Sequence, residues 1–294
     1  GRLRAVAEVM QGRAARFISA GGAPAYRGYM NPWLFDPPGL PVPVREDAPY
    51  VTQESQDSKG WRIRRTEQKL FEFRPDATHF RYPYVYGPYQ LVPREWLVVR
   101  RILDQRPFMI VPDGGLTLLS YGYAENVAHA LLLAVDNPED SRGKVYNVAD
   151  ETVLTLAQVV SIIARALDYP LEVVSMPFEL APCTRPLVAQ PLTTHRVQDV
   201  GAIRADLGYR DKVPPEDALA RTARWLVEHP PAPGGTEEMV LQDPFDYAAE
   251  DELLRRWRRL TDEFGVVEFS DPPGVGMAYS GPGGRERSQD SYVE

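Results

Sequence analysis

Short apolar segments alternate with amphipathic segments along most of this chain of 294 residues, and this alternation is the strongest constraint on its fold. Strand-like runs at 78–82 and 145–148 are interleaved with segments at 124–135 and 156–167, whose apolar residues recur at helical spacing. Strands that alternate with helices of this length form βα units, in which successive strands lie parallel and helices cover the sheet. The sequence therefore predicts an α/β fold with a largely parallel sheet.

Further strands and helices complete the predicted pattern. The segments 108–111 and 116–121 flank the turn Pro112-Asp-Gly-Gly115 and predict a β-hairpin. A proline-rich loop from about Gly22 to Asp57 is long for a compact domain, and loops of this length are usually functional or form a lid. The remaining predicted elements are strands at 16–19 and 171–175 and helices at 2–12, 58–73 (with Ser58 as its N-cap), 94–105 and 216–227.

The composition changes after His229. Pro230-Pro-Ala-Pro-Gly-Gly235 is typical of a linker, and residues 248–264 predict a charged amphipathic helix that either packs one stripe on the rest of the protein or recruits a partner. Residues 266–294 are rich in Pro, Gly, Ser and charge, which predicts a disordered tail. The predicted parts are a domain over 1–229, a linker and charged helix over 230–265, and the tail over 266–294.

The composition also excludes several classes of protein and site. A net charge of −8 is unsuited to a broad nucleic-acid or anionic-membrane surface, and no apolar run approaches the roughly 20 residues of a membrane-spanning helix. Cys183 is the only cysteine and the four histidines are scattered, so we expect no disulfide, no metal site and a reducing, cytoplasmic location. The chain begins at Gly1 without methionine or a secretory signal, so we expect Gly1 to be an internal point of a longer protein.

Four segments, in order, carry motifs of a known family. They are the run 16–22 followed by Tyr26; Phe80-Arg-Tyr-Pro-Tyr-Val-Tyr-Gly-Pro88; the run 121–130 with the later Gly143-Lys-Val-Tyr-Asn-Val148; and Asp199 with Leu207-Gly-Tyr209 and the helix that ends near Trp225. Together they resemble the extended short-chain dehydrogenase/reductase family of NAD(P)-dependent sugar epimerases and dehydratases.

The resemblance implies a Rossmann-like, doubly wound parallel sheet with a smaller C-terminal substrate lobe and a helical C-terminal extension. Such folds bind the pyrophosphate of NAD or NADP at a glycine-rich turn before a helix, but no G-x-G-x-x-G occurs in this chain. We therefore expect the N-terminal part of the sheet to be missing. Family members often dimerise through helices that correspond to 2–12 and 58–73, so a homodimer is also expected.

The family's catalytic residues are a Ser/Thr, a Tyr and a Lys one helical turn after the Tyr, and this chain has no Tyr-x-x-x-Lys. Counting back from Glu67, which resembles the family's Glu one turn after the Lys, places Ile63 at the Lys position and Lys59 at the Tyr position. The Ser/Thr position falls near Gly22, and Ser19 lies earlier on the same strand. The resulting catalytic candidates are Lys59, Ser19 and Tyr84, although Lys59 is alternatively a solvated residue near a helix N-terminus.

The substrate contacts also depart from the family pattern. Where nucleotide-sugar members carry an arginine that pairs with the diphosphate, this chain has Leu119, and the following Asp-Asp reads Glu125-Asn126. We therefore expect a substrate other than a typical nucleotide sugar. The alternating tyrosines Tyr82, Tyr84 and Tyr86 either line the ligand-binding crevice at the end of the strand or pack in the core. The resemblance implies cofactor contacts at Ser19, Ala20, Gly21, Tyr82 and Pro83, and substrate contacts at Tyr84, Tyr86, Arg185 and His195.

Two functional hypotheses follow. The first is an NAD(P)-dependent oxidoreductase, epimerase or dehydratase with a non-standard active site and a small-molecule substrate. The second is a catalytically silent protein that binds a dinucleotide or another ligand as a sensor or scaffold.

Overall fold

The computed structural model describes residues 6, 9–10 and 12–271 of the chain. Most of the helix predicted over 2–12, and the predicted tail from residue 272 onward, lie outside these residues. The chain divides into two compact units, 1–246 and 247–294.

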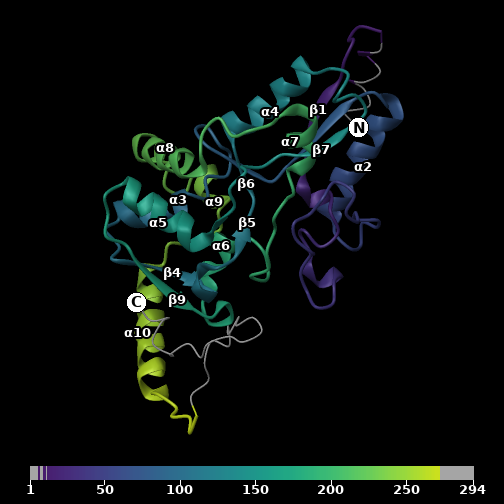
Figure 1. Cartoon of the computed structure of the whole chain (residues 1–294). Coiled ribbons are helices and arrows are strands. Elements are labelled where there is room, and N and C mark those ends of the chain that lie inside the picture. Colours follow the sequence, from purple (N-terminus) through teal and green to yellow (C-terminus); the bar gives the residue numbers. More distant parts are fainter. Residues whose placement is uncertain (1–5, 7–8, 11, 272–294) are drawn as a thin grey trace, which may run out of the picture. The chain divides into compact units, whose positions relative to one another are not determined.

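The first unit is built on a parallel sheet of three strands in the order β1-β2-β7. β1 is Ile18–Gly22, β2 is Thr78–Tyr82 and β7 is Val145–Asn147. The register pairs Ala20 with Phe80 and Phe80 with Tyr146. The expected α/β fold with parallel strands is confirmed, and all three strands lie close to their predicted positions (Figure 1).

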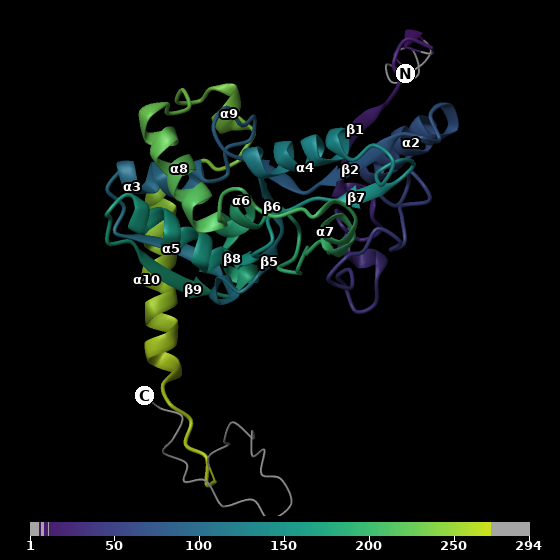
Figure 2. The same cartoon turned by 45° about the horizontal axis from the view of Figure 1, so that its top comes forward.

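Successive residues of β2 point to opposite faces of this sheet, as in any strand. Phe80 packs in an apolar cluster with residues of α4 (Ala124–Asp136) and α7 (Gly201–Leu207). Figure 2 shows α4 lying along the sheet. His79 and Arg81 point to the other face, where both contact Glu67 of α2 (Ser58–Phe73). The sheet therefore has an apolar face under α4 and α7 and a polar, buried face under α2.

The start of α2 is fixed by the loop that follows β1. Asp57, and not Ser58 as the sequence predicts, is the N-cap residue, and its side chain accepts a hydrogen bond from the backbone N–H of Gly60. A Cβ at Gly60 would lie 2.3 Å from the backbone oxygen of Pro24, so only glycine permits this approach. The long loop is thereby packed directly against the helix.

Most of the loop between β1 and α2 is irregular. It contains the short 3-10 helices η1 (Ala23–Ala25) and η2 (Pro32–Leu34). Tyr26, Leu40 and Val44 are nevertheless buried in a small apolar cluster of the loop's own. The loop is thus a packed layer over the polar side of the sheet.

A second group of elements carries shorter pairs of strands. β3 (Tyr84–Tyr86) pairs in parallel with β6 (Tyr121–Tyr123), β4 (Phe108–Pro112) in parallel with β9 (Glu172–Met176), and β5 (Leu118–Leu119) antiparallel with β8 (Leu154–Thr155). The helices α3 (Trp96–Leu103), α5 (Leu156–Ala166) and α8 (Pro215–Glu228) pack against one another nearby (Figure 1). The remaining short helices of this unit are η4 (Phe178–Leu180), η5 (Pro182–Thr184), α6 (Arg185–Val188) and α9 (Thr236–Met239).

The predicted hairpin of 108–111 with 116–121 is wrong. The turn Asp113–Gly115 is a 3-10 helix, η3, and the chain leaves it to pair β5 with β8 while β4 pairs with β9. The side chain of Asp113 accepts hydrogen bonds from the N–H of Phe178 and the hydroxyl of Thr193, both distant in sequence. These tertiary contacts outweigh the local turn preference of Asp-Gly-Gly.

The second unit contains the charged helix expected over 248–264, which is α10 (Tyr247–Phe264). Within it, Glu252 forms ion pairs with Arg255 and Arg256 one turn later. No helix among the described residues is both long and apolar enough to cross a membrane. The same part of the chain contains no cluster of His, Cys, Asp and Glu suited to a metal ion.

Candidate functional site

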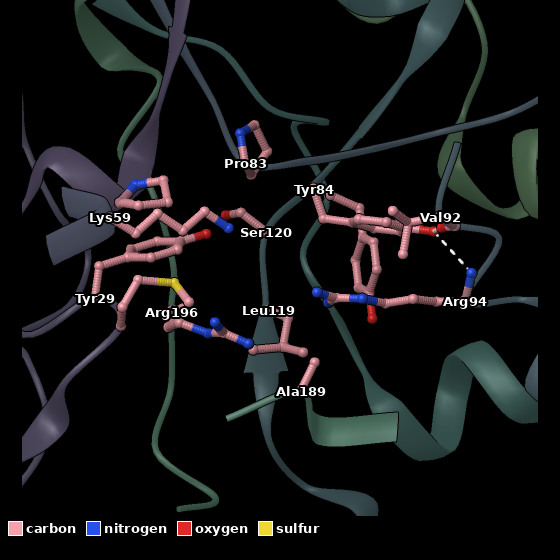
Figure 3. Close-up of a pocket in the computed structure, with 13 residues that line it drawn as sticks. Tyr29, Lys59, Pro83, Tyr84, Val92, Arg94, Leu119, Ser120, Ala189 and Arg196 are labelled. Carbon is pink, nitrogen blue, oxygen red and sulfur yellow. Dashed lines mark hydrogen bonds between the residues drawn. The ribbon is translucent and has the colours of Figure 1, made fainter. Parts of the chain in front are cut away.

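A cavity of about 210 Å³ opens where β1 and β2 end. Pro24 follows the end of β1 and Pro83 follows the end of β2, and both line the cavity (Figure 3). The carboxyl ends of parallel strands are the usual place for ligands in open α/β sheets. The other lining residues are Tyr29, Met30, Lys59, Tyr84, Val92, Arg94, Leu119, Ser120, Tyr121, Ala189 and Arg196.

Lys59 is brought to this cavity by the first turn of α2. The residue is exposed, and its amine forms no ion pair with the described part of the chain. Ile63, one turn later, lies on the side of α2 that faces the end of β1, about 3.9 Å from where a Cβ of Gly22 would stand. Lys59 therefore lines the cavity with its amine, whereas the apolar side chain of Ile63 packs near Gly22 at the end of β1.

Tyr84 lines the cavity with its ring but directs its hydroxyl elsewhere. That hydroxyl donates to the carbonyl of Val92 and accepts from the backbone N–H of Arg94 at 2.9 Å. Burial raises the pKa of Tyr84 well above its ordinary value. The hydroxyl of Tyr86 donates to the buried carboxylate of Asp150 at 3.0 Å, and Tyr86 does not line the cavity. Both tyrosines fix the surrounding backbone, and their predicted roles toward a ligand stay predictions.

The residues predicted to contact the cofactor are divided between the two faces of the sheet. The Oγ of Ser19 is 2.7 Å from Nδ1 of His79 on the α2 face, and the hydroxyl of Tyr82 reaches the carbonyl of Val127 in α4. Ala20 is exposed, and of this predicted set Pro83 lines the cavity. The structure therefore brings Pro83 to Lys59 and Tyr84 but does not bring Ser19 or Tyr82 there.

Arg185 and His195, predicted to contact the substrate, also lie outside this cavity. Arg185 is exposed at the start of α6. Nδ1 of His195 accepts from the N–H of Leu118, and its ring lines a separate hollow of about 480 Å³ beside the proline-rich segment Pro37-Pro-Gly-Leu-Pro41.

Two arginines of the cavity were not predicted from the sequence. Arg94 lies just before α3. The backbone of Arg196 pairs with that of Leu119 in an isolated β-bridge, and Leu119 is the position at which the family pattern has arginine. The sequence separation of 77 between Leu119 and Arg196 leaves no local signal for this pairing. The guanidinium of Arg196 thus comes from a distant segment to a place beside Leu119, where the family pattern has its arginine.

Asn126, which replaces the second Asp of the family motif, has a structural role in this fold. Its amide nitrogen donates to the carboxylate of Asp150 and the carbonyl of Val213, and its oxygen accepts from the backbone N–H groups of Lys212 and Val213. These contacts attach the start of α4 to the segment before α8. Asn126 therefore holds two segments of the fold together.

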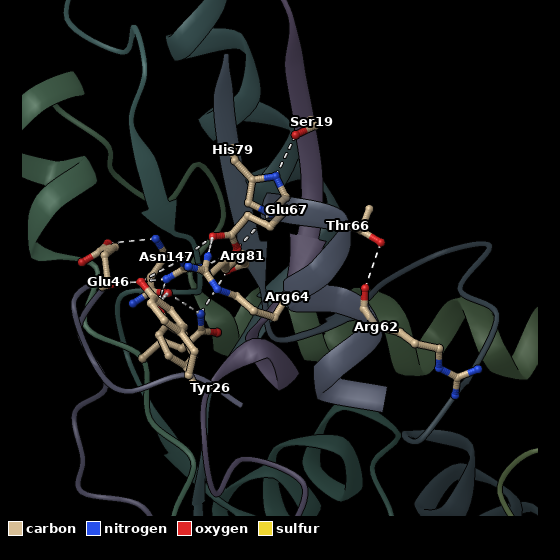
Figure 4. A network of polar contacts seen from close by, with 12 residues as sticks. Ser19, Tyr26, Glu46, Arg62, Arg64, Thr66, Glu67, His79, Arg81 and Asn147 are labelled. Atoms are coloured by element: carbon tan, nitrogen blue, oxygen red, sulfur yellow. Dashed lines mark hydrogen bonds and ion pairs between the residues drawn. The ribbon is translucent and has the colours of Figure 1, made fainter. Parts of the chain in front are cut away.

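Beside the cavity, a network of polar side chains fills the face of the sheet under α2 (Figure 4). Arg81 donates to both carboxylate oxygens of Glu67, at 2.9 and 2.7 Å. The same guanidinium donates to the hydroxyls of Tyr26 and Tyr50 and to the carbonyl of Glu46. Arg81 and Glu67 are 1% and 2% exposed, so this is a buried, bidentate ion pair.

The network sets the protonation of its members. Burial would raise the pKa of Glu67, but the hydrogen bonds and charge of Arg81 outweigh it, and the net pKa is lowered. Burial lowers the pKa of His79 to about 4, although Glu67 opposes this shift. His79 is therefore neutral at pH 7, between the hydroxyl of Ser19 and the carboxylate of Glu67.

Removal of Glu67 should strongly destabilise the fold. Glu67→Ala leaves the guanidinium of Arg81 buried without its counter-charge, so we expect a loss of about 3–5 kcal/mol in urea unfolding. Asp47→Ala, which breaks an exposed pair with Arg45 (77% and 70% exposed), should cost less than about 1 kcal/mol. The double variant Glu67→Ala/Arg81→Met should be more stable than Glu67→Ala alone. If Glu67→Ala costs no more than Asp47→Ala, the ion pair does not hold this face together.

The neutral His79 predicts a pH dependence of stability. The unfolded histidine has a pKa near 6.5 and takes up a proton that the folded one does not, so stability falls as the pH falls from about 6.5 toward 4. Between pH 7 and 5 we expect a loss of about 2 kcal/mol that His79→Asn does not show. The exposed His229→Asn should retain the wild-type dependence in urea unfolding at each pH. Equal slopes for the wild type and His79→Asn would contradict this assignment.

Comparison with known proteins supports the resemblance. Residues 67–149 match the sequence model of the NAD dependent epimerase/dehydratase family. Two curated proteins match at 24% identity: the uncharacterized protein YbjS of Escherichia coli, over 49% of this chain and 48% of the relative, and the uncharacterized protein y4nL of Sinorhizobium fredii, over 51% and 47%. The chain thus spans about half the length of the curated relatives it matches.

Solved structures share the fold. The UDP-glucose 4-epimerase of Thermotoga maritima, determined with UDP-glucose, has a TM-score of 0.59 at 20% identity, over 77% of this chain and 68% of that one. The dTDP-glucose 4,6-dehydratase of Bacillus anthracis, in complex with NAD, has a TM-score of 0.56 at 15% identity, over 77% and 66%. At these identities the likeness shows a Rossmann-like fold.

Proposed function

We propose that this protein, residues 67–149 of which match the NAD dependent epimerase/dehydratase family, is an NAD(P)-dependent oxidoreductase, epimerase or dehydratase with a non-standard active site. The observation that carries the proposal is the cavity at the ends of β1 and β2, because Lys59 lines it from the first turn of α2, where the resemblance implies the family's tyrosine.

The nicotinamide end of a dinucleotide fits the residues present. Pro24 and Pro83 give the cavity an apolar wall at the ends of the strands, and Lys59 offers a hydrogen-bond donor to a ribose or amide oxygen. The chain has no glycine-rich turn of the kind that holds the pyrophosphate, so the fit concerns this end alone. When bound, NAD(P) supplies a hydride acceptor or donor.

The chain's own residues would then orient the substrate and move a proton. The ammonium of Lys59 can donate a hydrogen bond to a substrate oxygen, and the neutral amine can accept its proton. The rings of Tyr84 and Tyr121 pack edge to face at 5.5 Å and give a rigid aromatic wall. In this proposal Lys59 replaces the family's tyrosine, and no residue replaces its lysine because Ile63 stands there.

The second candidate is a catalytically silent binding protein. Two observations favour it. Gly22 stands near the position of the family's Ser/Thr and has no hydroxyl, and the Oγ of Ser19 contacts His79 on the α2 face, away from the cavity. A protein of this kind would hold a dinucleotide or other ligand with its scaffold and would not turn it over.

Calorimetric titration of the whole protein with NAD and with NADP is the first test. Saturable binding of NAD or NADP supports the proposed enzyme, and it equally supports a silent protein that binds a dinucleotide. The absence of binding to either dinucleotide would overturn the proposed enzyme.

Substitution of Lys59 separates the two candidates. If Lys59 transfers the proton, Lys59→Met should lower the rate of nicotinamide reduction by about 10²-fold or more while dinucleotide binding persists. Lys69→Met, on the same helix and paired with Glu72 in solvent, should change neither quantity. The rates are followed by the fluorescence of reduced nicotinamide with a panel of hydroxy acids, sugar phosphates and nucleotide sugars. A wild-type protein that binds dinucleotide but reduces it with no member of the panel favours the silent protein.

A further inference from the structure

The cavity beside Lys59 is lined by three cationic side chains and by no carboxylate. Lys59 and Arg94 point into it from opposite sides, and Arg196 forms part of its floor (Figure 3). An excess of positive charge in a partly enclosed cavity attracts anions, since the low dielectric of its walls strengthens the interaction.

Arg196 is the most informative of the three. Its side chain is buried, at 5% exposure, yet it forms no ion pair with any carboxylate of the described residues. One terminal nitrogen donates to the carbonyl of Val188 at 3.0 Å, whereas Nε has no hydrogen-bond partner. A buried guanidinium without a counter-charge is costly, so its presence indicates a site that an anion completes.

Arg94 adds a second guanidinium to the same space. Its Cζ lies 4.4 Å from the centre of the Tyr84 ring, which holds the side chain over the cavity, and it forms no ion pair within the described part of the chain. Burial lowers the pKa of Arg196, and the positive charge of Arg94 lowers it further. Two like charges that face the same cavity repel each other until an anion lies between them.

An aromatic ring and a backbone bridge hold Arg196 in place. The ring of Tyr29 lies 5.2 Å from its Cζ, and the bridge of Arg196 to Leu119 fixes its backbone. The N–H of Gln198, two residues later, donates to the hydroxyl of Ser120, which also lines the cavity. Rigid packing of this kind suits a binding residue, because little side-chain freedom remains to be lost when a ligand binds.

The size of the cavity limits the ligand. Its volume of about 210 Å³ is below the roughly 300–1,000 Å³ typical of pockets for drug-sized molecules. A nucleotide sugar with its diphosphate would not be enclosed by it. A compact molecule with one anionic group and a hydroxyl fits better.

We propose that this cavity binds a small anionic substrate whose carboxylate or phosphate ester group lies between Arg196 and Arg94, with its reactive hydroxyl toward Lys59. Planar guanidinium groups bind either oxyanion through paired N–H donors, so the chemistry of recognition is shared. The assignment of this ligand as the substrate rests on the proposed function, whereas the anion site itself does not.

The test is a calorimetric titration of the whole protein without dinucleotide. The probes are glycolate, inorganic phosphate and glycerol 3-phosphate, with uncharged glycerol as the control and sodium chloride at equal ionic strength. We expect saturable binding of at least one anion and none of glycerol. The tighter of the carboxylate and phosphate probes identifies the natural group.

Substitutions locate the site. Arg196→Met should weaken binding of the anion by about tenfold or more, and Arg196→Lys should restore part of it. Arg165→Met, which removes an exposed guanidinium of α5 outside the cavity, should leave binding unchanged. Arg94→Met provides a second measurement if Arg196→Met fails to fold, and it should also weaken binding.

The proposal is overturned if no probe binds to the wild type, or if neither Arg196→Met nor Arg94→Met weakens binding. Its failure differs from failure of the proposed function. If the protein binds a dinucleotide but no anion, the anionic substrate is excluded and the proposed oxidoreductase remains. If it binds an anion but no dinucleotide, the anion site remains and the proposed oxidoreductase is excluded.

Discussion

The buried ion pair of Arg81 and Glu67 is the interaction on which the rest of the structure depends. It joins β2 to α2, and the remaining donors of the guanidinium hold Tyr26, Tyr50 and the carbonyl of Glu46 in the long loop. A bidentate pair with its other donors satisfied is the arrangement in which two charges tolerate burial. One side chain therefore fixes a strand, a helix and a loop with little regular structure of its own.

The position of the candidate site follows from this arrangement. Because α2 is held against β2 and the loop, its first turn presents Lys59 at the ends of β1 and β2, and the loop contributes Tyr29 and Met30 to the same cavity. Asp57 and the close approach of Gly60 to Pro24 fix where the helix begins. The long loop thus forms part of the wall of the cavity.

The elements of the fold could be predicted because each has its own local pattern. The helices at 124–135 and 156–167 show apolar residues at helical spacing, and most of their buried residues are apolar. The pairing between strands was harder to predict from the sequence. The Asp-Gly-Gly turn favoured a hairpin, yet β4, which is buried along its whole length, pairs with β9, a strand that follows α4 and α5 in the sequence.

The sequence by itself determined the α/β class, the parallel direction of the main strands, and the presence of Lys59, Ile63 and Leu119 where the resemblance implies other residues. Only the tertiary structure decided which side chains share the cavity. Ser19 does not line the cavity, because its Oγ contacts His79 under α2, whereas Arg196 reaches the place beside Leu119 from a segment 77 residues away. The reason is that a local pattern fixes which face of an element is apolar, while the charges that meet at a site depend on contacts between elements distant in sequence.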